Sequence, residues 1–192
     1  VCTALCIGDG CLRGKTPFFT CYEPALVEYV SQFLPKDLYI KRAGNTHNNI
    51  YDFKISSTLH KQNRLKELLV ADGLWNKTSE DKFIPSWVFK LSREKRILFL
   101  HNLWNCDGHV NRKQARYTTC SKQLSEDVLL LLKTVNIHAH QIIAGDRHYI
   151  IDLTGINRKE FEKIGKIGRN NTYELSRSHT RNPYIVDSII AL

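Results

Sequence analysis

The sequence predicts a mixed α/β (α+β) fold built from two similar halves related by a pseudo-two-fold axis, and three observations point to it. Each half contains an Asp-Gly pair at the end of a short apolar run, Asp9-Gly10 in the first and Asp107-Gly108 in the second. Each pair is followed by a short β-like run and then by a helix-like run. The matching segments, which stay about 98 residues apart, are 5–10 with 99–108, 18–21 with 117–120 and 51–55 with 149–153. A repeated order of motifs at one offset is typical of an internal duplication.

In the first half, turn residues separate runs of helical or strand-like spacing. Asp9-Gly10 ends the first helix, Pro35 ends the second, and the loop 44–49 has the Gly and Asn residues of a turn between strands. The predicted elements are a helix ending at residue 8, a strand over 18–21, a helix from 23 to 34, strands over 38–42 and 50–55, and a helix over about 60–71.

The second half repeats this order of elements. Ser92 is predicted to cap its first helix, and Gly145-Asp146 to form a tight turn between its last two strands. The predicted elements are a helix over 92–106, a strand over 115–120, a helix from about 121, strands over 137–144 and 148–153, and a helix over 159–166. Each half is therefore helix-strand-helix-strand-strand-helix, with a connector over about 73–92.

Composition narrows the class of protein. Of 192 residues, 42% are hydrophobic, which allows a real core and argues against disorder. The net charge of +9 favours nucleic acid as a partner, because Lys and Arg release counterions from a phosphate backbone. The six cysteines form no C-x-x-C pair, so we expect reduced thiols and an intracellular location, cytoplasmic or with the nucleoid. We expect no membrane span and no signal peptide, and because Val1 begins inside an apolar run we expect the chain to be cut from a longer polypeptide.

The two Asp-Gly pairs are candidate metal ligands. If the helices that precede them pack side by side, Asp9 and Asp107 meet at helix C-termini, which carry partial negative charge. With the carbonyl oxygens of Gly8 and Cys106, the two carboxylates would form an all-oxygen site suited to Mg²⁺ beside a phosphate. The alternative for either pair alone is a helix-ending turn, which is how we interpret Asp72-Gly73.

Two further blocks carry a resemblance to a known family. The run GLWNKTSEDKFIP (residues 73–85), and the segment 117–121 with Leu124 and Asp127, resemble the blocks that flank the second Asp-Gly motif in intein endonuclease domains, particularly those of replicative DNA helicases. Over residues 2 to about 168 the chain is thus similar to a LAGLIDADG homing endonuclease in its two-repeat, monomeric form. Asn102 departs from the small residue that the family places there.

The resemblance implies a function and a division of the chain. It implies a site-specific endonuclease that makes a double-strand break in a long target site, with Mg²⁺ or Mn²⁺ as cofactor, double-stranded DNA as partner and no membrane. The implied divisions are a first repeat over 1–72, a connector with the K-x-I-P block over 73–92, a second repeat over 93–168 and a C-terminal extension over 169–192.

The lysine of the K-x-I-P block is the third expected catalytic residue. In the family it reaches towards the scissile phosphate, so the resemblance gives Lys82 this role beside Asp9 and Asp107. The alternative is a solvated lysine at the end of a loop. The position expected for a second lysine holds Asn171, and Lys166 is out of register, so we expect the two strands to be cut at unequal rates.

The strands of each half are expected to form a curved sheet that enters a major groove. In the second half, Arg116 and Thr118 are expected to pair with His138 and His140. The candidates for DNA contact are Arg13, Lys15, Tyr39, Lys41, Lys54, Arg112, Lys113, Arg116, His138, His140 and Arg147. For any one of them the alternative is an ordinary solvated strand face or loop.

Three other functions are weighed against cleavage. A module of the same fold could bind DNA or RNA without cutting, as a decayed intein insert, a maturase or a transcription regulator, although both aspartates are present. Protein splicing needs a nucleophile at the first residue and a terminal His-Asn, and neither Val1 nor Leu192 fits. His138 and His140 could bind zinc from one strand face, but no second ligand pair is in sight.

Overall fold

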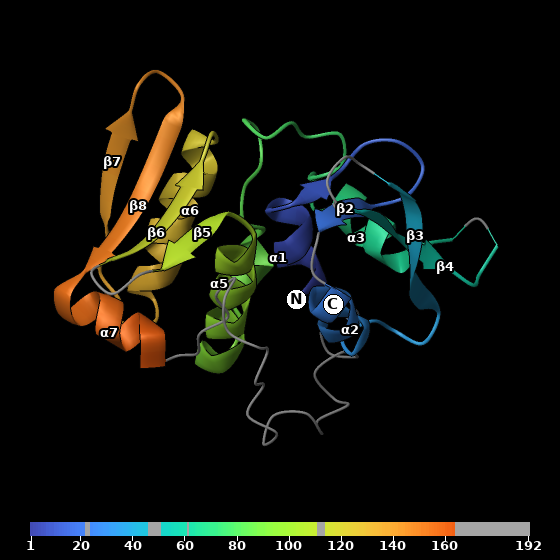
Figure 1. Ribbon diagram of the computed structural model, residues 1–192, viewed down its shortest axis with the longest axis horizontal. Coiled ribbons are helices and arrows are strands. Elements are labelled where there is room, and N and C mark those ends of the chain that lie inside the picture. Colours follow the sequence, from blue (N-terminus) through green and yellow to red (C-terminus); the bar gives the residue numbers. More distant parts are fainter. Residues whose placement is uncertain (22–23, 46–50, 61, 111–113, 164–192) are drawn as a thin grey trace. The chain divides into compact units, whose positions relative to one another are not determined.

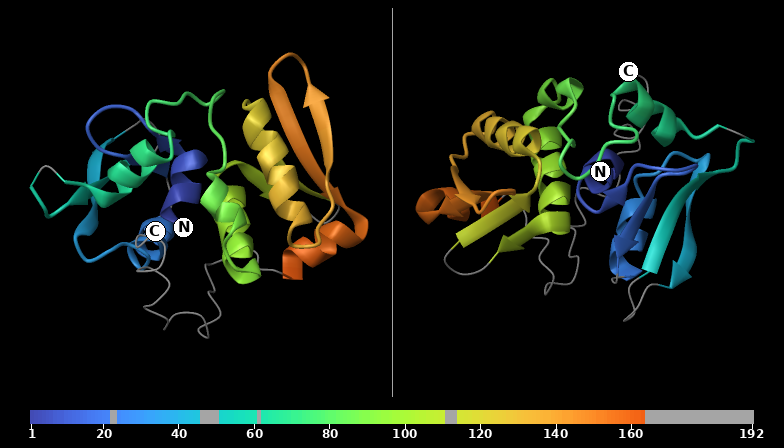
Figure 2. Two further views of the ribbon diagram at one scale, coloured as in Figure 1. Left: turned by 180° about the vertical axis from the view of Figure 1, so that it is seen from behind. Right: turned by 90° about the horizontal axis from the view of Figure 1, so that it is seen from above.

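The structure is a computed structural model that describes residues 1–21, 24–45, 51–60, 62–110 and 114–163 (Figure 1). Its described residues fall into two compact units, one formed by Val1–Asn76 and the other beginning at Lys77. Each unit contains one four-stranded antiparallel sheet and its own helices, and Figure 2 shows both from two further sides. The mixed α/β fold predicted from the sequence is confirmed.

The first unit has strand order β1-β2-β4-β3. Its helix α3 begins at an N-cap, because the side chain of Asn63 accepts a hydrogen bond from the N–H of Lys66. The elements are α1 (Cys2–Ile7), β1 (Gly10–Cys11), β2 (Phe18–Cys21), α2 (Pro24–Ser31), β3 (Leu38–Asn45), β4 (Tyr51–Ser57) and α3 (Arg64–Ala71).

The second unit has the corresponding strand order, β5-β6-β8-β7. Ser92 caps α5 and Ser121 caps α6, each accepting a hydrogen bond from an N–H three residues on. The elements are α4 (Ser86–Phe89), α5 (Arg93–Asp107), β5 (Gly108–Val110), β6 (Gln114–Thr119), α6 (Lys122–Lys133), β7 (His140–Ala144), β8 (His148–Thr154) and α7 (Gly155–Lys163).

The strand registers repeat between the units and reveal the duplication directly. Gly10 lies opposite Phe19, as Gly108 lies opposite Tyr117. Phe19 in turn lies opposite Phe53, as Tyr117 lies opposite Ile151, so equivalent positions are 98 residues apart. The division at residues 72, 92 and 168 and the two-fold axis stay predictions.

Each sheet has one face packed on its unit's helices and one outer face, because side chains alternate along a strand. In the second sheet Ala115, Tyr117, Ile151 and Leu153 are fully buried and define the packed face. The residues on the outer faces are Phe18, Thr20, Tyr39, Lys41, Asp52 and Lys54 in the first sheet, and His109, Arg116, Thr118, His140, Ile150 and Asp152 in the second. We use "outer face" for these two sets.

Several element boundaries differ from those expected. The short strands β1 and β5 were not predicted, because two or three residues show no periodicity and only their pairing with β2 and β6 defines them. Helix α2 ends at Ser31, before Pro35, as hydrogen bonds to the third preceding residue tighten the chain over 32–34. The other shifted elements are α3, which begins at Arg64, β7, which begins at His140, and α7, which begins at Gly155.

None of the helices that the structure describes combines the length and apolar character needed to cross a bilayer.

Candidate active site and nucleic-acid interface

Both aspartates lie where a helix gives way to the first strand of its sheet. Asp9 lies between α1 and β1, and Asp107 is the last residue of α5, directly before β5. The last turn of α1 is closed by Gly8 N–H, which donates to the Ala4 carbonyl, and that of α5 by Gly108 N–H, which donates to the Trp104 carbonyl. Asp9 thus lies one residue after the cap of its helix and Asp107 one residue before, so each carboxylate is at a helix C-terminus.

The glycine of each pair is required by a close approach of the backbone. A Cβ on Gly10 would overlap the main chain of Cys6, and a Cβ on Gly108 would overlap the carbonyl oxygen and ring of Trp104. Each glycine thus lies against the residue four positions before it, where the strand turns back over the last turn of the helix. The Asp-Gly spacing follows from this fold, since the aspartate stands at the point where the chain changes direction.

The donor atoms at these junctions fit Mg²⁺ or Mn²⁺. Carboxylates and main-chain carbonyls are hard oxygen ligands, and a helix C-terminus adds partial negative charge. The Cys106 thiol donates a hydrogen bond to the carbonyl oxygen of Asn102 at 3.3 Å. The carbonyl oxygen of Cys106 is the hard ligand atom that this residue offers. Among the described residues, no three His, Cys, Asp or Glu side chains are grouped as a metal site. Asp9 and Asp107 belong to different units, and their shared site stays a prediction.

Helix α5 accommodates two polar side chains in its buried part. The amide of Asn102 donates from Nδ2 to the Leu98 carbonyl at 2.6 Å, one turn earlier in the same helix. His101 packs edge-on against Phe161 of α7, with ring centroids 5.9 Å apart. Burial lowers the pKa of His101 from 6.5 to about 4, so its ring is neutral at neutral pH.

Lys82 is a buried residue, with 7% of its surface exposed. Its carbonyl accepts a hydrogen bond from Ser121 Oγ at 2.6 Å, and Ile84 N–H donates to Asp127 Oδ2 at 2.8 Å. Ser121 caps α6 and Asp127 lies within it, so the K-x-I-P segment is attached to that helix at two points. The alternative interpretation of Lys82 as a solvated loop lysine is wrong.

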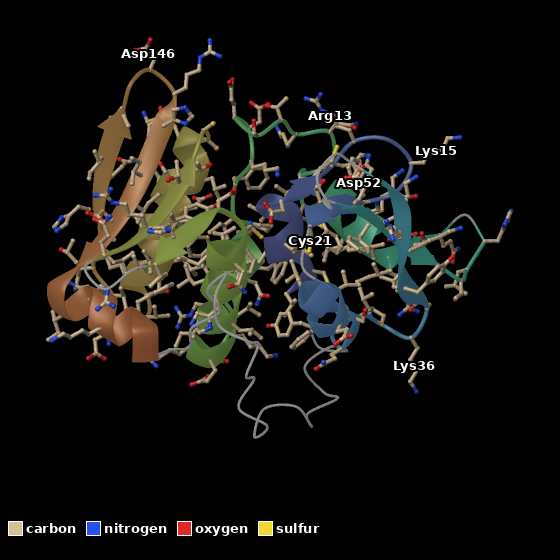
Figure 3. The ribbon with its side chains drawn as sticks, in the orientation of Figure 1. Arg13, Lys15, Cys21, Lys36, Asp52 and Asp146 are labelled. Carbon is tan, nitrogen blue, oxygen red and sulfur yellow. The ribbon has the colours of Figure 1, made fainter. Side chains whose placement is uncertain are left out.

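The first sheet presents its DNA-contact candidates on one side. Tyr39, Lys41 and Lys54 are exposed on the outer face, and Lys41 lies directly opposite Lys54. Arg13 and Lys15 are exposed on the loop between β1 and β2 (Figure 3). The placement is compatible with the predicted DNA contacts, which stay predictions.

The pairing predicted for the second sheet is wrong. Strand β8 lies between β6 and β7, so Arg116 and His140 each face Asp152 and not one another. His138 precedes β7, and its N–H donates to the side chain of Asn157. The two histidines therefore do not share a strand face, and the geometry considered for zinc is absent there.

The remaining candidates lie on loops or outside the described residues. Arg147, in the turn between β7 and β8, pairs with Glu80 at 3.5 Å, and both side chains are well exposed. The residues that lie outside the described part of the chain are Arg112, Lys113, Lys166 and Asn171.

Two outer-face residues of the second sheet were missed from the sequence. His109, Arg116, Asp152 and His140 form one row across all four strands. Asp152 lies in an apolar run, and His109 lies in a strand of three residues, so neither had a periodic signal. The 98-residue offset could have found Asp152, because it aligns Asp152 with the candidate Lys54, but it aligns His109 with Cys11, which was not a candidate.

Comparisons with known proteins agree with this geometry. The family model described as a LAGLIDADG-like domain matches residues 94–168. The replicative DNA helicase DnaB of Nostoc sp. is 28% identical over 184 residues, covering 84% of this chain and 21% of the helicase. A DNA gyrase subunit of Mycobacterium kansasii is 27% identical over 142 residues, covering 70% of this chain and 24% of the gyrase polypeptide. The chain thus spans less than a quarter of either relative.

Two solved structures share the fold. The homing endonuclease I-DmoI in complex with DNA and Mn has a TM-score of 0.58 at 16% identity, over 84% of this chain and 91% of its own. The N-terminal LAGLIDADG domain of DUF199/WhiA has a TM-score of 0.52 at 12% identity, over 85% of this chain and 80% of its own. The LAGLIDADG-like family model thus matches part of the second unit, and the fold shared with these two structures extends over both units. In sequence the chain is similar to a segment of the Nostoc DnaB helicase.

Proposed function

We propose that this chain is a site-specific DNA endonuclease that acts as a monomer inside the cell and cuts both strands of a long target, using Mg²⁺ or Mn²⁺. The observation that carries the proposal is the repeated helix–Asp–Gly–strand junction, with a glycine required in each copy. One such junction would be an ordinary helix end. Two such junctions, 98 residues apart, would provide one carboxylate for each half of a shared site.

DNA is the partner that the charge and the fold favour. The net charge of +9 suits a polyanion. The LAGLIDADG fold is shared with I-DmoI, which has been solved with DNA and Mn and with DNA and Ca. Each sheet of this chain has an outer face that carries polar and charged side chains, and a major groove is wide enough to accept β-strands.

The chemistry divides among few residues. Asp9 and Asp107, with the carbonyl oxygens of Gly8 and Cys106, would hold the divalent cation. When bound, the cation would supply activation of water and charge stabilisation at the phosphate. Lys82 would place an ammonium beside the reacting phosphate, where positive charge offsets the charge that develops in the transition state. Ser121 and Asp127 would keep the Lys82 segment in place through its main chain.

The names of the relatives favour an inserted module. The chain matches a fifth to a quarter of a helicase and of a gyrase polypeptide, two proteins with different names and activities. A segment common to both is readily explained as an element that moves between genes. The proposed target is therefore a helicase or gyrase gene that lacks the segment.

A second candidate function is DNA binding without cleavage. The observation that favours it is the shared fold of the WhiA domain, whose TM-score of 0.52 is close to that of the endonuclease. Fold alone does not separate the two functions. The aspartate pair favours cleavage, and experiment can distinguish them.

The test is a cleavage assay on plasmids carrying bacterial helicase and gyrase genes without the segment. We expect one double-strand cut with Mg²⁺ or Mn²⁺, none with a chelator, and none with Asp107→Asn. Specific binding of one plasmid fragment without any cut, under every metal tested, would favour the binding module. Failure to bind any DNA preferentially would overturn both candidates.

A further inference from the structure

The centre of the second sheet's outer face holds one ion pair. Strands β6 and β8 are the two inner strands of that sheet, and Arg116 and Asp152 are register partners on them. Arg116 Nε donates to Asp152 Oδ1 at 3.0 Å. The Asp152 side chain is 11% exposed and that of Arg116 is 39% exposed, so the carboxylate lies beneath and the guanidinium reaches outward.

This contact leaves the outer edge of the guanidinium available. An arginine has five N–H donors in a rigid planar fork, and Asp152 engages the one on Nε. The two terminal NH₂ groups form the opposite edge of the plane. Their spacing matches the O6 and N7 acceptors that guanine presents in the major groove.

The local charge favours a base over a phosphate. Asp152 neutralises Arg116, and a carboxylate at this position repels the DNA backbone. A site built to bind phosphate gains nothing from an acid there, whereas a base reader gains a fixed orientation.

The first sheet has a different set of residues at the equivalent positions. Phe18 and Lys54 replace Arg116 and Asp152 there. An acid does occur on that outer face, but Asp52 accepts a hydrogen bond from Thr20 Oγ1 at 2.7 Å instead of holding an arginine. The arginine–carboxylate arrangement therefore belongs to the half of the DNA site that the second sheet contacts.

We propose that Arg116 reads one guanine of the target in the major groove and that Asp152 is the residue that positions it. This rests on the proposed function in that the chain must bind DNA, but it does not require cleavage. Arg116 is then a specificity-determining residue, and Asp152 acts through it without touching the DNA.

The test measures base preference in binding and not cutting. A randomised duplex library is selected with the full chain in a chelator, and the preferred site is then varied one base pair at a time. For the wild type, we expect one guanine whose replacement weakens binding by about 5- to 100-fold. Arg116→Gln and Asp152→Ala should both lose this preference, while Asp152→Ala should bind the average sequence as tightly or more tightly, because it removes a negative charge.

Two controls separate positioning from charge and from loss of structure. Asp52→Ala removes the same charge from the outer face of the first sheet and should keep the guanine preference. Replacing that guanine by 7-deazaguanine, which lacks the N7 acceptor, should weaken wild-type binding but not weaken Arg116→Gln further. Retention of the guanine preference in Asp152→Ala or in Arg116→Gln would overturn the inference. If the wild type selects no sequence at all, it is the proposed function that fails.

Discussion

The two units repeat the Asp-Gly junction closely but differ on the outer faces of their sheets. Gly10 and Gly108 meet the same obstacle, the residue four positions back, and the strand registers around them correspond. On the outer faces, Lys54 corresponds to Asp152 and Phe18 to Arg116. The lesson is that the copies agree where the backbone packs against itself and differ where side chains face outward.

This difference suggests unequal roles for the two sheets. The outer face of the first sheet carries Lys41 opposite Lys54, two positive charges that suit phosphates. The matching row of the second sheet carries the Arg116–Asp152 pair, whose charges cancel. We therefore expect the first sheet to contribute more to affinity and the second more to discrimination between bases.

The largest effect is expected in the salt dependence of DNA affinity, and the two sheets should contribute unequally to it. If roughly 6–10 phosphates are contacted, affinity should fall by about 10³–10⁵ between about 50 and 200 mM salt. Changing Lys41 and Lys54 together to Gln should reduce the slope of log affinity against log salt by about two, and Arg116→Gln by less than one. Binding titrations at several salt concentrations measure both slopes. Equal slopes of log affinity against log salt in the two variants would contradict the unequal roles proposed for the two sheets.

The two aspartates should be equally necessary for cleavage. Asp9→Asn and Asp107→Asn should each lower double-strand cleavage by about 10³-fold or more, because each removes a metal-holding carboxylate worth several kcal/mol. DNA affinity should change little, since neither residue lies on an outer face. Cleavage and binding assays on matched preparations test this. Full activity in either variant would refute the shared site.

Acid should destabilise the second unit more than the first. His101, with its pKa lowered to about 4 by burial, corresponds to the untitratable Thr3 of the first unit. As pH falls below about 6.5 the unfolded chain takes up a proton that the folded one refuses, so stability is complete above this pH and is lost towards pH 4, by at most about 3 kcal/mol. Hydrogen exchange against pH should show α5 opening before α1. His101→Phe should remove most of the difference in acid sensitivity between the two units. If the pH profile of this variant is the same as that of the wild type, His101 is not the cause.

Lys82 should affect cleavage rate and not binding. Lys82→Ala should slow cutting by about 10²-fold, as for loss of one positioned charge in a transition state. Lys166→Ala should slow it less, and Asn171 at the other expected lysine position predicts unequal strands. A time course of supercoiled, nicked and linear plasmid should therefore show a nicked intermediate in the wild type. Lys90→Ala, an exposed lysine beyond α4, is the matched control. Wild-type rates in Lys82→Ala would contradict its role.

The smallest effect is expected on the free energy of unfolding when the junction glycines Gly10 and Gly108 are replaced. Gly10→Ala and Gly108→Ala should each cost about 1–3 kcal/mol, because the added methyl group overlaps backbone atoms that cannot move without disturbing the helix. Gly44→Ala, where the added Cβ has no neighbour within 4 Å, should leave the melting temperature nearly unchanged. Thermal melts of the three variants test this. An unchanged melting temperature for Gly10→Ala together with a large decrease for Gly108→Ala would show that the two junctions differ in their packing.

Much of the fold was predictable because its signals are local. The strand Phe18–Cys21 and the cap at Ser92 follow from residue types and spacing within a few positions. The pairing of Arg116 was not predictable in this way. It depends on β8 lying between β6 and β7, an arrangement that no local pattern of those strands contains.

The sequence by itself determined that this chain is a duplication with one Asp-Gly pair in each half, because equal spacing between like motifs needs no knowledge of contacts. It also determined the basic charge and the K-x-I-P block. Only the tertiary structure decided that Lys82 is buried and attached to α6, and that Asp152 holds Arg116. Those contacts join residues 36 to 39 positions apart, and they exist only once the strands and helices have packed.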